Sequence, residues 1–251
     1  MPIRERHKIY FASDFHLGLD VGESSLSREK KIVNWLVSAS ADAKEIYLLG
    51  DIFDFWWEYK KVIPKGFTRL LGTISSITDS GIPVHFFTGN HDLWADNYFS
   101  EECGMIMHRS PLTVTFNEKA FHLAHGDGFE TRDVWKKFLR SIFRNRILQK
   151  MYSALHPSIG MWIGQKWSLN SRLDKGVEEF QGEENEGLIR YAKAALAKEK
   201  IDYFIFGHRH LAMNYQINPD SEILFLCDWI SKCNYAQWDG ETLRLMEYCQ
   251  D

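Results

Sequence analysis

The sequence predicts an α/β fold with two sheets, outer helices and a helical insertion in its second half. First, the N-terminal half alternates short apolar segments with longer segments whose apolar residues repeat at helical spacing. Second, the C-terminal part contains several short apolar segments bounded by turn residues, which is typical of strands in a further sheet. Third, apolar and basic residues at helical spacing fill a region around 131–180. The 251 residues are enough for a single domain carrying this insertion, which we call the cap.

The first half is expected to run strand, helix, strand, helix, strand. Such alternation predicts parallel strands joined by right-handed crossovers. The second helix is expected to close near Gly81. The five elements are expected over residues 8–12, 28–40, 45–49, 67–77 and 82–87.

The second half is expected to contain a hairpin, the cap, another helix and further strands. The hairpin turns at Asn117-Glu118-Lys119. The two last strands, 222–228 and 242–247, are expected to close the second sheet. The two arms of the hairpin are expected over 112–116 and 120–124. The helix is expected over 183–200 and is followed by a strand over 203–206.

Composition and charge indicate a soluble protein with one basic region. No apolar run is long enough to span a bilayer, and the charged N-terminus does not resemble a signal peptide, so we expect a cytoplasmic protein. The net charge is −4, but residues 131–176 carry +8 and the remainder −12. This basic segment favours a local anionic partner, either substrate phosphate or a membrane surface, over nucleic acid. A solvated helix face is the alternative.

Seven side chains of metal-ligand type lie in five short clusters, each where a strand is expected to end. Sites in open parallel sheets form beyond the carboxyl ends of strands, so these side chains are expected to converge. Oxygen and nitrogen donors without cysteine suit two divalent cations such as Mn²⁺, Zn²⁺ or Fe²⁺. Two such ions are a device for displacement at phosphorus. The seven are Asp14, His16, Asp51, Asn90, His125, His208 and His210.

The spacing within the clusters suggests individual roles. Asp14-x-His16 is expected to place both side chains on one face of an extended segment, where they reach the same ion. His208-x-His210 repeats that spacing, with one histidine for each ion.

The remaining clusters suggest a bridging ligand and a catalytic pair. Asp51 follows Gly50, which permits a tight turn, and is the expected bridge between the ions. His91 is expected to face substrate, and Asp92 to accept a hydrogen bond from its ring.

This ordered set resembles the calcineurin-like metallophosphoesterase superfamily. The resemblance implies a four-layer α/β/β/α sandwich with a dinuclear site between the sheet ends. It implies that water activated by the two ions attacks phosphorus, with His91 assisting. One ion would be held by Asp14, His16, Asp51 and His210, and the other by Asp51, Asn90, His125 and His208.

Within the superfamily, the chain looks most similar to the UDP-2,3-diacylglucosamine hydrolases of lipid A synthesis. The similar motifs are Leu49-Gly-Asp-Ile-Phe-Asp-Phe-Trp56, His125-Gly-Asp127 before the basic insertion, and Leu226-Cys-Asp-Trp229. The resemblance implies cleavage of the pyrophosphate to UMP and 2,3-diacylglucosamine 1-phosphate, and we expect Mn²⁺ as the metal. It places substrate contacts at Asn90, His91, Asp133, Ser171, Lys175 and His208.

The cap suits such a substrate, because acyl chains need an apolar cleft and a diphosphate favours nearby Arg and Lys. Phe143, Trp162 and Trp167 are candidates to line that cleft, or else simply pack the cap against the domain. The basic surface also suggests peripheral contact with the inner membrane, on its cytoplasmic face. The oligomeric state stays open.

Two positions depart from this family's usual pattern. His91 stands where well-studied members carry Arg, and Arg209 separates two histidines where the family more often has Thr. A phosphodiesterase or phosphatase for another nucleotide or diphosphate is therefore the alternative enzyme. A non-catalytic scaffold is disfavoured because all seven ligand-type residues are retained.

Overall fold

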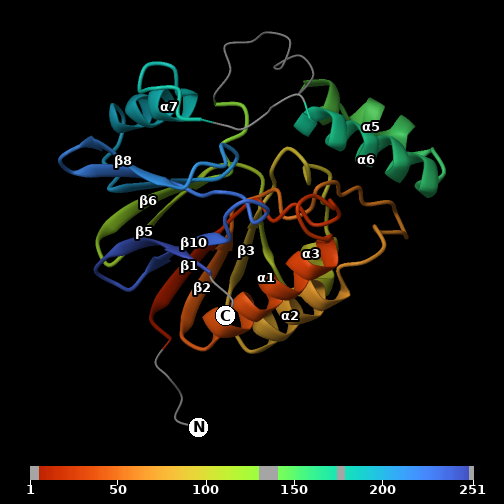
Figure 1. Cartoon of the computed structure of the whole chain (residues 1–251), viewed down its shortest axis with the longest axis horizontal. Coiled ribbons are helices and arrows are strands. Elements are labelled where there is room, and N and C mark those ends of the chain that lie inside the picture. The colour runs from red at the N-terminus through yellow and green to blue at the C-terminus, as the bar shows by residue number, and fades with distance from the viewer. Residues whose placement is uncertain (1–5, 130–140, 174–178, 249–251) are drawn as a thin grey trace.

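A computed structural model describes residues 6–129, 141–173 and 179–248, except for the side chains of 170–173. Two sheets pack face to face between two helical layers (Figure 1). Helices α1 (Ser25–Ser40), α2 (Thr68–Asp79) and α3 (Tyr98–Cys103) cover the outer face of the first sheet. Helix α7 (Gly187–Leu196) covers the outer face of the second. The predicted four-layer α/β/β/α sandwich is confirmed.

The first sheet has the strand order β11-β10-β1-β2-β3-β4. Strands β1 to β4 pair in parallel, so their carboxyl ends lie along one edge. β10 pairs antiparallel with β1, and β11 with β10. The strands are β1 (Lys8–Ala12), β2 (Ala43–Leu48), β3 (Val84–Phe87), β4 (Ile106–His108), β10 (Asn234–Trp238) and β11 (Leu243–Glu247).

The second sheet has the order β5-β6-β7-β9-β8. Its central strands β6, β7 and β9 are parallel, and β5 and β8 are antiparallel edges. Asn117 and Glu118 join β5 to β6 with positive φ angles of 45° and 65°, so the predicted hairpin is confirmed. The strands are β5 (Leu112–Phe116), β6 (Lys119–Ala124), β7 (Tyr203–Phe206), β8 (Met213–Asn218) and β9 (Ser221–Phe225).

One predicted strand exists but belongs to a different sheet from the one expected. Segment 242–247 was expected to close the second sheet, but β11 pairs with β10 at the edge of the first. The segment 222–228 does enter the second sheet, as β9. The partner of a short apolar strand depends on contacts with distant segments, which its own residues do not specify.

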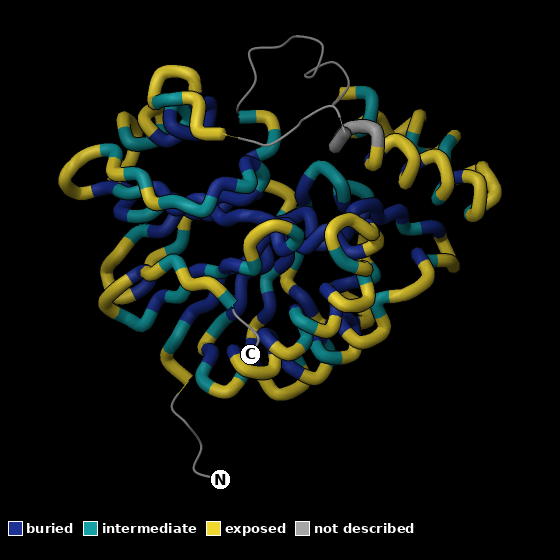
Figure 2. Tube along the Cα trace, in the orientation of Figure 1, coloured by how far each residue is buried: buried dark blue, intermediate teal, exposed yellow. Residues whose placement is uncertain are grey.

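The buried residues, dark blue in Figure 2, gather along the strands and the inner sides of the helices. Three apolar clusters account for most of this core. Phe11 of β1 and Phe121 of β6 stack between the sheets with ring centroids 6.1 Å apart. On the side of the first sheet that α1 covers, Trp35 packs on Trp229 with ring centroids 5.3 Å apart. Burying aromatic side chains of this size stabilises the sandwich and holds the two sheet edges in register.

Helices α5 (Arg146–Ser153) and α6 (Pro157–Leu173) lie to one side of the sandwich, beyond the ends of its strands (Figure 1). Asn145 caps α5 by accepting from the backbone N–H groups of Ile147 and Leu148. The two helices contact the loop that follows β2, where Trp57 and Tyr152 pack at 4.3 Å between ring centroids. These helices fall within the expected cap.

Candidate metal centre

The strands place the ligand-type side chains at one end of the sandwich. Asp14, Asp51 and Asn90 follow β1, β2 and β3, whose carboxyl ends share an edge. His125 follows β6, and His208 and His210 follow the neighbouring strand β7.

Backbone hydrogen bonds join these strand-end turns to one another. The N–H of Asp14 donates to Gly50 O, and that of His16 to Asp51 O, each at 3.0 Å. These bonds tie the loops after β1 and β2 together.

Five of the ligand-type residues have left-handed backbones. The φ angles are 57° at Asp14, 44° at His16, 52° at Asp51, 64° at His208 and 47° at His210. Non-glycine residues avoid this region, and such strain concentrates at functional sites. The expected extended geometry at Asp14 and His16 is therefore wrong. Both side chains nevertheless lie in the same cluster of ligand-type atoms.

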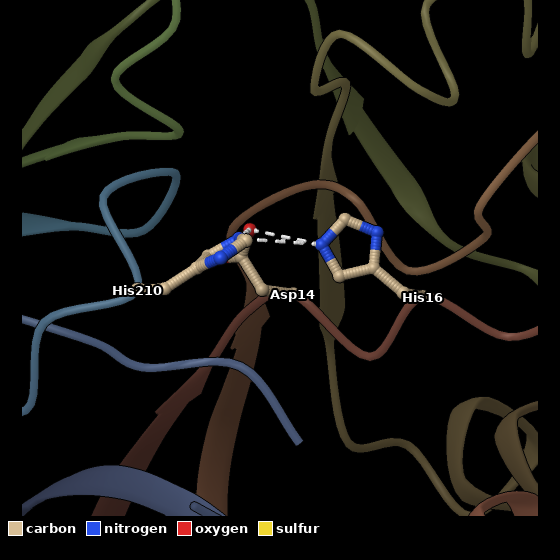
Figure 3. Close-up of side chains that lie close together, drawn as sticks. All are labelled: Asp14, His16 and His210. Atoms are coloured by element: carbon tan, nitrogen blue, oxygen red, sulfur yellow. Dashed lines mark hydrogen bonds and ion pairs between the residues drawn. The ribbon is translucent and has the colours of Figure 1, made fainter. Parts of the chain in front are cut away.

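Asp14, His16 and His210 form a first group (Figure 3). His210 Nε2 lies 3.2 Å from Asp14 Oδ1, and His16 Nε2 lies 3.5 Å from the same oxygen. The two Nε2 atoms are 3.4 Å apart. Two ring nitrogens and a carboxylate oxygen at these separations suit a shared cation.

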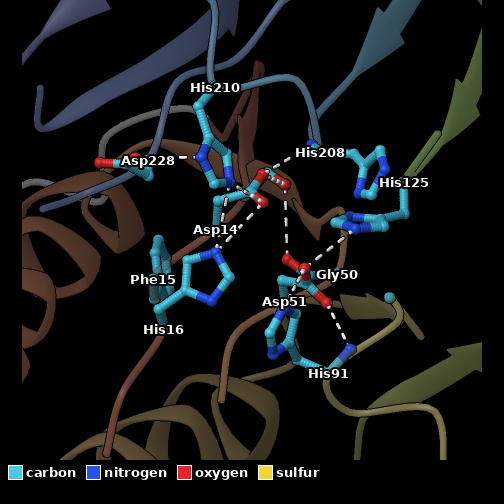
Figure 4. Close-up of polar contacts among 12 residues, drawn as sticks. Asp14, Phe15, His16, Gly50, Asp51, His91, His125, His208, His210 and Asp228 are labelled. Atoms are coloured by element: carbon cyan, nitrogen blue, oxygen red, sulfur yellow. Dashed lines mark hydrogen bonds and ion pairs between the residues drawn. The ribbon is translucent and has the colours of Figure 1, made fainter. Parts of the chain in front are cut away.

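Asp51, His125 and His208 form a second group (Figure 4). His125 Nδ1 donates to Leu49 O at 2.8 Å, which leaves Nε2 directed at Asp51 Oδ2, 3.2 Å away. A carbonyl that fixes one ring nitrogen as a donor leaves the other free to bind metal.

His16, Asp51 and His91 form a third group. Because His16 also belongs to the first group and Asp51 to the second, Asp51 lies next to both of those groups. The His91 N–H donates to Asp51 Oδ1 at 2.9 Å (Figure 4). The position is compatible with a bridging carboxylate.

Charges in the centre are balanced between buried acids and imidazoles. Burial alone would raise the pKa of Asp14, but hydrogen bonds from His16 and His210 bring it well below its usual value. Burial likewise opposes ionisation of Asp51, whose pKa is nevertheless lowered well below its usual value, above all by His125. Burial alone would lower the pKa of His125, but the charge of Asp51 raises this pKa well above its usual value.

The protein's own groups fit divalent cations. Ionised acids here need positive charge nearby, which protons on the imidazoles or bound metal ions can supply. The side-chain oxygen of Asn90 is buried and has no hydrogen-bond partner among the described residues. A buried acceptor without a donor is costly unless a cation or water satisfies it.

The structure corrects the expected role of Asp92. Its buried carboxylate accepts from the backbone N–H groups of Gly89 at 2.7 Å and Ile52 at 2.8 Å, not from the His91 ring. His91 Nδ1 instead lies 2.8 Å from the backbone oxygen of Asp54. Adjacent residues in a turn point their side chains in different directions, so sequence proximity did not imply contact. Asp92 joins the loops after β2 and β3.

Two acids support the histidines and were not assigned this role from the sequence. Asp228 Oδ2 lies 3.2 Å from His210 Nδ1, on the side away from the ligand group (Figure 4). Asp54 Oδ1 lies 3.6 Å from His16 Nδ1. A carboxylate within hydrogen-bond distance of a ligand histidine, as at Asp228, fixes the tautomer and raises ligand basicity. Asp54 is farther from His16 and acts on it through its charge. The signal for Asp228 was its position beyond β9, a third parallel strand of the second sheet.

The expected substrate contacts are only partly described. Asn90, His91 and His208 lie in or beside the centre. Asp133 and Lys175 lie outside the described residues, and Ser171 is described only as backbone within α6.

A four-layer sandwich with acids and imidazoles gathered at its strand ends is typical of metal-dependent hydrolases. The model of the calcineurin-like phosphoesterase family matches residues 7–212, and the chain belongs to this family. The chain is therefore an enzyme, a phosphoester hydrolase.

Curated relatives extend over nearly the whole chain. It is 39% identical to a UDP-2,3-diacylglucosamine hydrolase of Porphyromonas gingivalis, over 96% of this chain and 97% of that protein. A UDP-2,3-diacylglucosamine hydrolase of Haemophilus influenzae is 28% identical over 90% and 92%. A solved dimetal phosphatase of Danio rerio is 13% identical with a TM-score of 0.49, over 97% and 96% of the two chains.

Proposed function

We propose that the enzyme hydrolyses the pyrophosphate of UDP-2,3-diacylglucosamine to UMP and 2,3-diacylglucosamine 1-phosphate, a step of lipid A synthesis. The similarity to two hydrolases named for this substrate supports the proposal. The structural observation that carries it is an apolar cavity of about 370 Å³ between the β2 loop and the cap helices.

The apolar cavity suits acyl chains. It has the size of a small-molecule site, and each methylene buried there contributes about 0.8 kcal/mol. Phe143 and Trp167, two of the expected cleft residues, line it, whereas Trp162 does not. The lining is Phe55, Trp57, Trp94, Ile142, Phe143, Leu148, Gln149, Tyr152, Ile163, Gly164 and Trp167.

The cavity is next to the metal centre along two segments. Phe55 follows Asp54, whose carboxylate and carbonyl face His16 and His91. Trp167 precedes Ser168, which contacts His91. Acyl chains in the cavity would therefore leave the diphosphate near the ligand groups.

We infer that two divalent cations, most simply Mn²⁺, are held by the expected ligands, with Zn²⁺ or Fe²⁺ as alternatives. Asp14, His16 and His210 would hold one ion, and Asn90, His125 and His208 the other, with Asp51 shared. Bound there, the cations would supply Lewis acidity to the phosphoryl group and lower the pKa of water. Metal analysis of purified protein tests the stoichiometry.

The chain's own residues orient the reaction. Because a carbonyl can only accept, His91 carries its Nδ1 proton toward Asp54 O, and Nε2 faces the centre 4.0 Å from Asp51 Oδ2. From there Nε2 can hold a proton near a phosphoryl oxygen or the leaving group. Asn90, His91, His208, Asp133, Ser171 and Lys175 remain the proposed substrate contacts.

A polar cavity of about 490 Å³ favours the alternative, a phosphodiesterase for another nucleotide or diphosphate. It adjoins the apolar cavity at Trp57, Trp94 and Gln149. Four cations, Arg109, Arg144, Arg146 and Lys150, line it and would suit an anion. Glu58 and Asp96 line it as well, and Asp96 pairs with Arg109 at 3.3 Å.

Hydrolysis assays with Mn²⁺ separate these functions. UDP-2,3-diacylglucosamine would be compared with UDP-glucose, ADP-ribose and an aryl phosphodiester. Release of UMP from the acylated sugar alone supports the proposal. Turnover of the aryl diester alone would contradict it and favour the alternative. Asp51→Ala is expected to abolish activity in either case.

We also propose peripheral contact with an anionic membrane on its cytoplasmic face. Ile147, Met151 and Trp162 of the cap helices are 70%, 65% and 61% exposed, close in sequence to Arg146, Lys150 and Lys166. Exposed apolar side chains among cations are typical of interfacial helices. No helix among the described residues has the length and apolar character needed to cross a bilayer.

Vesicle sedimentation at low salt tests membrane contact. Trp162→Ser is expected to weaken binding to anionic vesicles, whereas Leu26→Ser, at an exposed apolar position of α1, is the matched control. Equal binding by both variants, or no binding by the unmodified enzyme, would contradict the proposal.

A further inference from the structure

Helix α6 contacts the β2 loop through three small residues spaced four apart. Gly160, Gly164 and Ser168 therefore share one face of the helix. A Cβ atom at Gly160 would overlap the Tyr59 hydroxyl, and one at Gly164 would overlap the Phe55 ring. The helix thus lies as close to the loop as its backbone allows, and its position leaves little room for adjustment.

Ser168, the third of these residues, brings a buried hydroxyl to the edge of the metal centre. Its residue surface is 2% exposed. Its Oγ donates to Asp54 Oδ2 at 2.8 Å and lies 2.9 Å from His91 Nδ1. A hydroxyl buried among apolar side chains is unfavourable unless hydrogen-bonded, so these contacts hold the helix and the loop together.

The hydrogen-bond chemistry fixes the direction of each proton. His91 Nδ1 lies 2.8 Å from Asp54 O, and a carbonyl oxygen can only accept, so Nδ1 carries a hydrogen. The Ser168 hydrogen points to the Asp54 carboxylate. Ser168 Oγ is therefore a second acceptor for the same Nδ1–H.

Two segments consequently hold one imidazole. The β2 loop supplies Asp54 O, and α6 supplies Ser168 Oγ, which together set the plane of the His91 ring and direct Nε2 inward. Without the hydroxyl, one acceptor remains and the ring can turn about its Cβ–Cγ bond. Misorientation of a general acid lowers the rate more than it lowers binding.

We propose that Ser168 is a positioning residue for His91, through which the placement of cap helix α6 sets the geometry of phosphoester hydrolysis. This rests on the proposed function only in that His91 assists the reaction. The residue before it, Trp167, lines the apolar cavity, and Gly164 lines it one turn earlier. Contact of an acyl chain with this helix is thereby transmitted to the imidazole.

The test is a double-mutant cycle of Ser168→Ala and His91→Ala on the Mn²⁺-loaded enzyme. Ser168→Ala is expected to lower kcat about 10- to 100-fold with KM changed less than about twofold. In the His91→Ala background, Ser168→Ala is expected to have no further effect. Ser168→Thr, which keeps the hydroxyl, is expected to recover most of the rate. Ser158→Ala, at an exposed position of the same helix, is the control and is expected to be unchanged.

The outcomes separate positioning from a merely structural role. Additive losses in the double variant, or a rise in KM with unchanged kcat, would overturn the proposal. Loss of bound Mn²⁺ in Ser168→Ala would do the same. The cycle is run on both UDP-2,3-diacylglucosamine and an aryl phosphodiester. Turnover of only the diester would refute the proposed substrate, while coupling between the two residues on that diester would still support the positioning role.

Discussion

Replacing Arg28 by methionine probes how the strained first ligand loop is held. Arg28 lies on α1, is fully buried, and donates from Nε to Phe15 O at 2.9 Å. Its Nη2 donates to His16 O at 2.9 Å and Leu19 O at 2.5 Å. These carbonyls belong to the loop on which Asp14 and His16 have left-handed backbones. We expect the guanidinium to stabilise that conformation.

The magnitude follows from the groups left behind. Arg28→Met leaves the carbonyls of Phe15 and Leu19 without the guanidinium, whereas His16 O retains the N–H of Leu19 at 3.4 Å. Each buried acceptor without a partner costs about 1–3 kcal/mol. Methionine fills part of the volume and removes a buried charge, which offsets some of the loss. We expect the free energy of unfolding to fall by about 3 kcal/mol.

Urea denaturation in EDTA measures this loss without a contribution from metal binding. A 3 kcal/mol change moves the midpoint by roughly 1 M or more. Mn²⁺ affinity is expected to weaken by about tenfold or more, because displaced ligands no longer converge. Lys31→Met, on the same helix, removes only a partly exposed pair with Glu23 at 2.8 Å and is expected to cost less than about 1 kcal/mol. Equal midpoints for the two variants, or unchanged Mn²⁺ affinity of Arg28→Met, would refute the reasoning.

Three further predictions concern the loops and one distant histidine. Gly50→Ala places a Cβ atom 2.7 Å from His125 Nδ1, at a residue whose φ is +90°. We therefore expect urea titrations to show a free energy of unfolding about 2 kcal/mol lower, together with loss of bound metal. A normal metal content would contradict this. Asp228→Asn removes the charge behind His210, so we expect calorimetric titration to show an affinity for Mn²⁺ that is about 10- to 100-fold weaker. An unchanged affinity would mean that this carboxylate has only a structural role. Burial and a neighbouring histidine lower the pKa of His108 to about 4, so the unfolded chain takes up its proton first as pH falls from 6.5 toward 4, and stability declines. Since the ring is only partly buried, we expect urea titrations at several pH values to show that His108→Gln reduces this decline by about 1 kcal/mol, and parallel pH profiles of the two proteins would exclude it.

The ligand set could be predicted from the sequence because each member follows a strand that is recognisable locally. β1 and β7 have the predicted bounds, since short apolar segments before polar turns are local signals. Parallel pairing then brings the turns after them to one edge. Asp14, Asp51 and His125 were therefore identifiable as candidates before their distances were known.

The sequence by itself determined the alternation of strands and helices and the residue types at the strand ends, because these depend on local pattern and chain order. The ordered ligand motifs carried the resemblance to the family, and with it the expected sandwich. Only the tertiary structure decided that β11 joins the first sheet, that Asp54 rather than Asp92 faces the His91 ring, and that Ser168 reaches it from the cap. The physical reason is that strand partners and side-chain directions are set by contacts with segments far away in the chain. Ser168 lies 77 positions from His91, and no periodicity in either segment encodes their meeting.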